Sequence, residues 1–260
     1  MNVLKWHKKG AGNLPAKSAG SAIAVILGTI AIWQGISAAA RIPALPGPYE
    51  IALASGRVAP ALGLHMLVSM WRVVAGSLIA LSLGVPLGCF VGRNRTIDTV
   101  IAPVIYLAYP VPKIAFLPVI LLFLGLGDTS KIFIIVLLVF FQIFVSTRDA
   151  ARNLPPSLVY SVKALGATPR DIYRHAIIPA ILPEIFTATR IGLGTGLATL
   201  FFTETFATFH GLGYFIMDAW SRAAYDEMFA GIMALSILGF VLFAALDIIE
   251  RRTCRWKHLN

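Results

Sequence analysis

Long apolar runs recur along this chain of 260 residues, and they restrict its possible folds more than any other feature of the sequence. Runs near or above about 18 residues are typical of helices that cross a lipid bilayer. Charged residues make up 13% of the chain, whereas a soluble domain of this length carries about a quarter. The sequence therefore predicts an all-α, polytopic membrane protein.

We expect about six transmembrane helices, each near the length that a bilayer requires. Their approximate ranges are 20–39, 66–91, 97–125, 130–146, 184–208 and 228–249. Residues 1–19 are expected to form a cytoplasmic N-terminal segment. Residues 20–260 then form the transmembrane domain, which includes one polar loop at 150–180.

Positive charge is concentrated on one side of these expected spans. If the N-terminus is cytoplasmic, 15 of the 22 Lys and Arg residues fall in cytoplasmic segments, a bias that sets the orientation of membrane proteins. The cytoplasmic set is Lys5, Lys8, Lys9, Lys17, Arg93, Arg95, Arg148, Arg152, Lys163, Arg170, Arg174, Arg251, Arg252, Arg255 and Lys257. The external set is Arg41, Arg57, Lys131 and Arg222. We therefore expect both termini and the polar loop in the cytoplasm, and we read the net charge of +10 as topology rather than as nucleic-acid binding.

A secretory signal is the alternative for the first span. Lys5 to Lys9 precede an apolar run, and "SAAAR" at 37–41 resembles a small-residue cleavage site. The apolar run is longer than a usual signal core, so we favour a retained span. In both cases residue 41 emerges outside, and the rest of the topology is unchanged.

The polar loop contains "SVKALGATPRDIYRHAIIP" (161–179), which predicts two short helices broken at Gly166. Pro155 and Pro156 can open the first helix, because a proline at the first helical position lacks only a donor that would have no partner there. Gly166 fits a left-handed stop at the end of that helix.

The second helix of this hairpin has its own start and stop signals. Thr168 caps it and Pro169 is its first residue, while Asp171 completes a capping box with Asp in place of Glu. Pro179 is expected to end it. The pattern by itself also fits an amphipathic loop that rests on lipid headgroups.

Small residues fall at steps of four along the second span, at Gly76, Ala80, Gly84, Gly88 and Gly92. Small residues at this spacing let a second helix approach closely within lipid. Helix packing is the interpretation that we favour, and a pore-lining stripe is the alternative.

Three prolines interrupt the third span directly after Tyr109: Pro110, Pro112 and Pro118. Each proline removes a helical hydrogen bond, and the freed carbonyls need partners or a water-filled cavity. The sequence therefore predicts a broken span at this point.

Lys113 lies beside the break, and an ionisable residue at membrane depth is a functional hypothesis in its own right. The alternatives are that Lys113 snorkels to the interface or pairs with a carboxylate such as Glu204. The candidate residues for a solute pathway are Tyr109, Pro110, Pro112, Lys113 and Glu204.

Acidic and basic residues lie near the ends of the last two long spans, and their positions predict an ion pair between helices. Glu204 is 20 residues past Glu184, or about 30 Å along a helix, which places it toward the outer face. Arg190 lies near the inner end of the same span, as Asp247 and Glu250 do on the last span. We interpret an ion pair of Arg190 with one of these acids as structural.

"ALGATPRDIYRHAIIPAILPEI" (164–185) resembles the conserved cytoplasmic loop of permease subunits of binding-protein-dependent ABC importers. That loop has a Glu-Ala-Ala triplet, a Gly after three residues and Ile-x-Leu-Pro after nine more. Gly166 and the pair Ile178-Pro179 match this pattern, whereas Ala176 replaces the isoleucine. The triplet is absent, and its positions hold Tyr160, Ser161 and Val162.

Four further segments resemble the nitrate, sulfonate and taurine branch of these permeases. They are "LPGPYEIALA" (45–54), "YPVPKIAFLPVILLFLGLGDTSK" (109–131), "TATRIGLGTGLA" (187–198) and "GLGYFIMDAW" (211–220). The resemblance implies the type I ABC importer permease fold, as a homodimer in the inner membrane with the pore between the subunits. It also implies two ATP-binding cassette subunits, which bind ATP and Mg²⁺, and an external binding protein. No cofactor or metal is expected on this chain, and the solute stays open among nitrate, sulfonates, bicarbonate and vitamin precursors.

The resemblance further implies that the hairpin is the coupling helix, seated in a groove of the ATPase. ATP-driven closure of the ATPase pair is a rigid-body movement, and a short helix locked by prolines at both ends can act as a lever. The residues implied in coupling are Tyr160, Ala164, Gly166, Ala167, Thr168, Asp171 and Pro179.

Other classes of protein fit the sequence less well. The nearest match to a phosphate-binding loop, "GLGDTSK" at 125–131, has Ser130 where glycine is required, and we find no H-E-x-x-H, C-x-x-C or G-x-S-x-G motif. Cys89 and Cys254 have no spacing that suggests a metal site or a disulfide framework. We therefore expect that this chain is not an enzyme. An ion- or proton-coupled secondary transporter is the alternative function, but such proteins usually contain inverted repeats, and the two halves of this chain are not alike.

Overall fold

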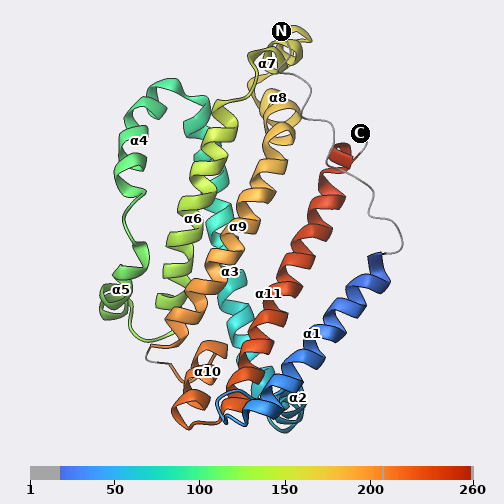
Figure 1. Cartoon of the computed structure of the whole chain (residues 1–260). Helices are drawn as coiled ribbons and strands as arrows, with labels where there is room; N and C mark the ends of the chain where they lie inside the picture. The colour runs from blue at the N-terminus through green and yellow to red at the C-terminus, as the bar shows by residue number, and fades with distance from the viewer. Residues whose placement is uncertain (1–17, 207, 259–260) are drawn as a thin grey trace, which may run out of the picture.

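The computed structural model describes residues 18–206 and 208–258, and in this part of the chain it contains helices and no strand (Figure 1). The elements in chain order are α1 (Ser18–Ala40), α2 (Pro48–Arg57), α3 (Ala59–Arg93), α4 (Arg95–Ala108), the 3₁₀ turn η1 (Lys113–Phe116), α5 (Leu117–Leu124), α6 (Asp128–Arg152), α7 (Pro156–Ala164), α8 (Pro169–Ile172), the π turn η2 (Tyr173–Ile177), α9 (Ile178–Glu204), α10 (Leu212–Ser221), α11 (Tyr225–Thr253) and the 3₁₀ turn η3 (Arg255–His258). The all-α prediction is confirmed. The N-terminal lysines Lys5, Lys8, Lys9 and Lys17 lie outside the described residues.

Within the described residues, four helical segments are long and apolar enough to cross a bilayer: α3, α6, the segment Pro169–Glu204 and α11. The helix α4 together with η1 and α5 passes the same criterion as a pair bent by 78°, and it makes a fifth span if the pair crosses the bilayer once. The helix α1 is apolar over the shorter stretch Ala24–Ala40. In chain order these six elements overlap the six expected ranges, although α1 does not meet the criterion for a span, and the break in the third range lies where its prolines predict it.

Different elements lie at the two ends of the helical bundle. Figure 1 shows α7, α8 and the end of α11 at one end of the molecule, and α2 and α10 at the other. The hairpin and the end of the last span therefore share a side, as the charge-based topology requires. Which side faces the cytoplasm stays a prediction.

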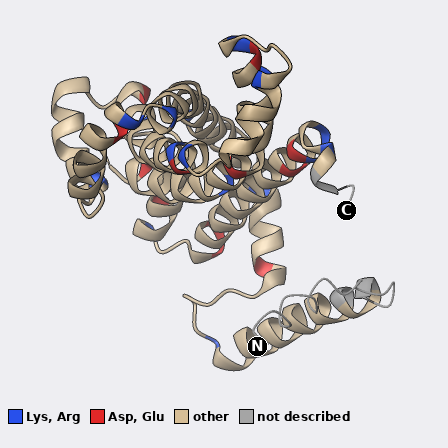
Figure 2. Cartoon of the chain, turned by 90° about the horizontal axis from the view of Figure 1, so that it is seen from above, with Lys and Arg blue, Asp and Glu red and all other residues tan. Residues whose placement is uncertain are grey.

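The bundle is built around α3, α6 and α9, which pack against one another along their length. Val73 of α3, Val139 and Ile143 of α6 and Leu200 of α9 form the fully buried centre of this packing. The helix α1 stands apart from these three helices when the molecule is seen from above (Figure 2), and most of its described side chains are exposed. A ring contact between Trp33 and Phe229 of α11 joins α1 to the bundle.

The small residues of α3 are packing residues, as predicted. A Cβ atom added to Gly76 would lie 2.7 Å from the Ile135 side chain, and one added to Gly88 would lie 2.7 Å from the carbonyl oxygen of Phe144. Both neighbours belong to α6. The stripe therefore serves close contact between α3 and α6.

The prediction that Pro179 ends the second helix of the hairpin is wrong. The helix that starts at Pro169 continues through the π turn into α9, and Pro179 lies in the first turn of α9. Proline has no N–H for the carbonyl four residues earlier, which favours a break. In the π turn the hydrogen bonds span five residues instead, and the N–H of Ile178 bonds to the carbonyl of Tyr173. This shift accommodates the proline without a break.

Candidate functional site

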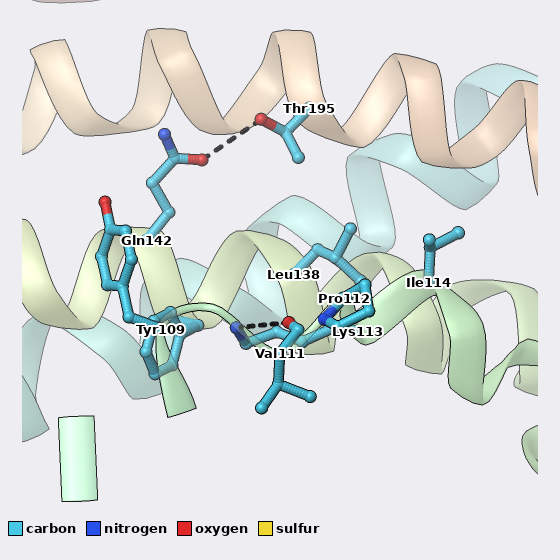
Figure 3. Close-up of a pocket in the computed structure, with 9 residues that line it drawn as sticks. Tyr109, Val111, Pro112, Lys113, Ile114, Leu138, Gln142 and Thr195 are labelled. Atoms are coloured by element: carbon cyan, nitrogen blue, oxygen red, sulfur yellow. Dashed lines mark hydrogen bonds between the residues drawn. The ribbon is translucent and has the colours of Figure 1, made fainter. Parts of the chain in front are cut away.

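The broken third span forms one side of a cavity of about 310 Å³ (Figure 3). Its break contributes Tyr109, Val111, Pro112, Lys113 and Ile114 to the lining, while α6 contributes Leu138, Phe141 and Gln142 and α9 contributes Thr195. Four of the five candidate pathway residues fall in this region of the chain. Pro110 lies in the turn and is not among the lining residues, and Glu204 lies elsewhere.

Lys113 is held by the backbone of the break itself. Its Nζ donates to the carbonyl oxygen of Ala108 at 3.0 Å and to that of Val111 at 3.5 Å. In an unbroken helix the Ala108 carbonyl would accept from residue 112, which is a proline and has no N–H. The ammonium group therefore takes the place of the missing donor.

The ammonium group of Lys113 also lies over an aromatic ring. Its Nζ is 3.9 Å from the centroid of the Phe141 ring, which is the geometry of a cation–π contact. No ion pair of Lys113 is found within the described ranges. Of the alternatives for this residue, the structure therefore does not support pairing with Glu204.

Gln142 and Thr195 complete the polar lining, and sequence reasoning missed both. The Thr195 hydroxyl donates to Oε1 of Gln142 at 3.3 Å, which leaves the amide nitrogen of Gln142 available to a solute (Figure 3). The signal was present, because Gln142 is the one polar residue between Lys131 and Ser146 in an otherwise apolar run.

The polar face continues from this cavity toward the hairpin end. A second cavity of about 570 Å³ lies between α6 and the start of α9, and Ser146, Asp149, Asn153 and Glu184 line it. Residues spaced three and four apart share a helix face, so Gln142 begins the row that these α6 residues continue. The two cavities therefore lie on the same side of the bundle.

Glu204 lies in the interior of the subunit and not at a cavity. Its side chain is fully buried at the end of α9, where Arg72 Nη1 donates to Oε1 at 2.8 Å. The Ser69 hydroxyl and the Gly213 N–H donate to Oε2 at 2.8 Å and 2.9 Å. These donors compensate the loss of water around the carboxylate, which would otherwise be costly.

The same buried network extends to the loops at the end of the bundle opposite the hairpin. Arg72 also donates to Asp128 at 2.6 Å and to the carbonyl oxygen of His210 at 2.7 Å. The fully buried Lys131 donates to the carbonyl oxygens of Leu126 and Gly127 at 2.6 Å and 3.2 Å. The network thus ties the loops before α6 and α10 to the bundle. Its arginine was detectable as a charge within the second apolar run.

The predicted ion pair near the other end of α9 is confirmed. Arg190 Nη2 lies 2.5 Å from Oδ1 of Asp247 and 2.7 Å from Oε2 of Glu250, and this joins α9 to α11. A comparable pair that the sequence did not reveal joins α6 to α4, where Arg148 lies 2.5 Å from Asp98. Both pairs serve the packing of helices.

The hairpin has the local geometry that its sequence predicts. Gly166 has φ of +81°, which is the left-handed conformation. Thr168 accepts from the N–H of Asp171 at 3.3 Å, and the carboxylate of Asp171 accepts from the N–H of Thr168 at 3.1 Å, which completes the capping box. The turn therefore has a fixed shape.

The residues implied in coupling are accessible to a partner. Tyr160, Ala164, Gly166 and Thr168 are exposed, and Ala167 and Asp171 are partly exposed. Leu165 is 87% exposed beside them, an unusual position for a large apolar side chain. Pro179 is the second residue of α9, beyond α8 and the π turn, so it is separated from the tip of the hairpin.

Comparison with known proteins supplies the family. Residues 84–255 match the binding-protein-dependent transport system inner membrane component family. The taurine transport system permease protein TauC of Escherichia coli is 33% identical over 192 residues, which cover 74% of this chain and 70% of TauC. The nitrate import permease protein NrtB of Synechococcus elongatus is 28% identical over 224 residues, which cover 82% of this chain and 80% of NrtB.

A solved structure supports the same assignment of the fold. The inward-facing MetNI methionine ABC transporter matches with a TM-score of 0.65 at 20% sequence identity, over 76% of this chain and 98% of the matched chain. The fold together with the family match and the relatives defines the class of protein, a transport permease. The chain belongs to the binding-protein-dependent transport system inner membrane components, and it is a membrane-spanning permease subunit of an ABC importer.

Proposed function

We propose that two copies of this chain form the translocation pathway for a small anion of the sulfonate or nitrate kind. An external binding protein delivers the anion, and two ATPase subunits drive its import. The observation that carries this proposal is Lys113, a cation at the break of a membrane span that lines a cavity with Gln142 and Thr195. Relatives named for nitrate and taurine transport support this choice, because nitrate is an anion and the zwitterion taurine carries an anionic sulfonate group.

The cavity chemistry suits an anion that must bind and then leave. An ammonium group has three donors, and the two carbonyls that hold Lys113 leave one of them for a solute. The amide nitrogen of Gln142 is a neutral donor nearby. A cavity of about 310 Å³ is at the small end of the roughly 300–1,000 Å³ of ligand sites. One cation with weak neutral donors gives the modest affinity that passage requires.

The continuous helix from Pro169 to Glu204 supports a coupling role for the hairpin. This helix begins in the hairpin, carries Thr195 at the cavity and ends in the buried outer network. A displacement of the hairpin by an ATPase would therefore reach all three places through one rigid element. The hairpin is then cytoplasmic, as are both termini.

Reconstitution tests the proposal. The chain is purified with its ATPase and placed in vesicles, the binding protein is added, and uptake of labelled nitrate, an alkanesulfonate and a neutral amino acid is compared. We expect ATP-dependent uptake of an anion, with about two ATPase copies per permease dimer. Uptake of the neutral solute with no competition from anions would refute the anion assignment, and uptake without any ATPase would refute the importer.

A further inference from the structure

A third cavity, of about 510 Å³, lies between the end of α3 and the segment that joins the hairpin to α9. Its walls are apolar and include Val85, Pro86 and Phe90 of α3 and Ile178 of α9. The first two cavities are lined by α6 and α9, with the break of the third span at the first of them, whereas α3, α8 and the π turn line this groove, so it opens on a different side of the bundle.

Two arginines stand at the rim of the groove. Arg170 and Arg174 lie one helical turn apart, and both are exposed. Within 18–206 and 208–258 neither side chain forms an ion pair or a hydrogen bond. The nearby carboxylate of Asp171 is engaged by the backbone and hydroxyl of Thr168 in the capping box. The rim therefore carries two cations, and the carboxylate beside them, that of Asp171, interacts electrostatically with Arg174 but forms its hydrogen bonds with Thr168.

We propose that this groove binds one anionic phospholipid from the leaflet that borders the hairpin. The acyl chains would lie against Val85, Pro86 and Phe90, and the phosphate between Arg170 and Arg174. Guanidinium groups bind phosphate oxygens in a bidentate manner, and basic pockets between membrane helices at the charged side of a membrane bind anionic headgroups. Tyr173, also at the groove, suits the headgroup level, where tyrosine is enriched.

The chemistry of the groove favours a lipid over a soluble protein. A phosphate alone would satisfy the arginines but make no contact with the apolar walls. The exposed Phe90 belongs to a span, where its surroundings are acyl chains. Only a ligand with an anionic head and an apolar tail matches both ends of the cavity.

The position of the groove gives the lipid a role. Arg174 and Tyr173 belong to the π turn, which joins the hairpin to the long helix of the cavity. A phosphate bound to Arg170 and Arg174 would hold α8 and the π turn together. Coupling between ATP hydrolysis and transport should therefore depend on anionic lipid.

The test uses the full chain with its ATPase in detergent, incubated with phosphatidylglycerol or with phosphatidylcholine of the same chain length. Native mass spectrometry counts the retained lipids. We expect selective retention of phosphatidylglycerol, and a photoreactive group on its acyl chain should label the segment 85–90. Inorganic phosphate and glycerol phosphate at equal concentration should not displace it, because they lack the tail.

The decisive variant is Arg170→Gln with Arg174→Gln. It should abolish the preference for phosphatidylglycerol, whereas Arg251→Gln with Arg252→Gln, which removes two exposed arginines of α11 at the same end, should leave it intact. Equal retention of both lipids by the parent protein overturns the proposal, and so does labelling outside the groove. Loss of the ATPase with unchanged lipid selectivity would instead assign the arginines to the ATPase contact, and would also overturn it.

Discussion

Arg72 and Glu204 form an ion pair in the interior of the subunit, with Nη1 of the arginine 2.8 Å from Oε1 of the glutamate. Their side chains are 3% and 0% exposed. The pair lies between α3 and α9 at the end of the bundle opposite the hairpin, and it holds the loop that leads into α10 through the carbonyl of His210. It fixes one end of α9, and the other end of that helix continues into the hairpin.

The buried pair gives the first prediction. Arg72→Met should destabilise the purified permease by about 3–5 kcal/mol, because it leaves the Glu204 charge buried without its partner. Glu204→Gln should cost less, since the neutral amide still accepts from Gly213 and Ser69. Thermal unfolding in detergent measures both. The double variant should be more stable than the sum of the single effects predicts, and strict additivity would contradict the pairing.

The second prediction concerns Lys113. Lys113→Met should reduce anion uptake strongly while the complex with the ATPase still assembles, because the cavity loses its cation. It should also free the Ala108 carbonyl, so Lys113→Arg, which keeps a cationic donor, is the matched control. Uptake and co-purification are measured on the same preparations. If Lys113→Met transports every tested anion at the parent rate, the lysine only stabilises the break.

The third prediction concerns the turn of the hairpin. Gly166→Val should cost on the order of 1–2 kcal/mol in backbone strain, because Gly166 has φ of +81°. A Cβ atom at this position meets no atom within 4 Å, so the effect is conformational and not a clash. We expect an inserted permease with weakened ATPase binding or uncoupled hydrolysis.

Two controls bracket this result. Asp171→Ala should impair ATPase binding and coupling less than Gly166→Val, because a capping contact is worth about 1 kcal/mol. Gly56→Val changes a glycine that also has open space around it but no positive φ, and it should not affect the ATPase. Pull-down and substrate-stimulated hydrolysis are the measurements. Normal binding and coupling by Gly166→Val would reduce the hairpin to a surface loop.

The fourth prediction concerns the contact between α3 and α6. Gly88→Ala should destabilise the bundle by about 1–3 kcal/mol, because the added methyl group would lie 2.7 Å from the Phe144 carbonyl oxygen. Gly63→Ala on the same helix is the control, since a Cβ there meets no atom within 4 Å. Unfolding in detergent should separate the two variants. Equal stability would show that α6 can move away at no cost.

The fifth prediction is the orientation in the membrane. Cysteine introduced at the exposed Ile42 or Phe209 should react with an impermeant maleimide added to intact cells, and cysteine at Ala167 should not. The native Cys89 and Cys254 are buried and give little background. Labelling of Ala167→Cys in sealed cells would contradict this orientation, because it would show that the hairpin lies outside.

The sequence by itself determined what depends on neighbouring residues. Apolar runs set the order of the membrane helices, because each run must be long enough to cross a bilayer. The turn at Gly166 and the capping box of Thr168 and Asp171 were predictable because their hydrogen bonds join residues three apart. The prolines after Tyr109 predicted the break, since a missing N–H acts on its own helix.

The tertiary structure decided which distant residues meet. Arg72 is 132 residues from Glu204, and no local pattern selects it from the other basic residues. The cavity likewise joins Lys113, Gln142 and Thr195 from three elements, so only the packing of those helices identifies it. The structure around Pro179 also differs from what its local sequence predicts. A proline alone favours a break, but the π turn moves the hydrogen bonds by one residue and the helix continues to the far end of the bundle.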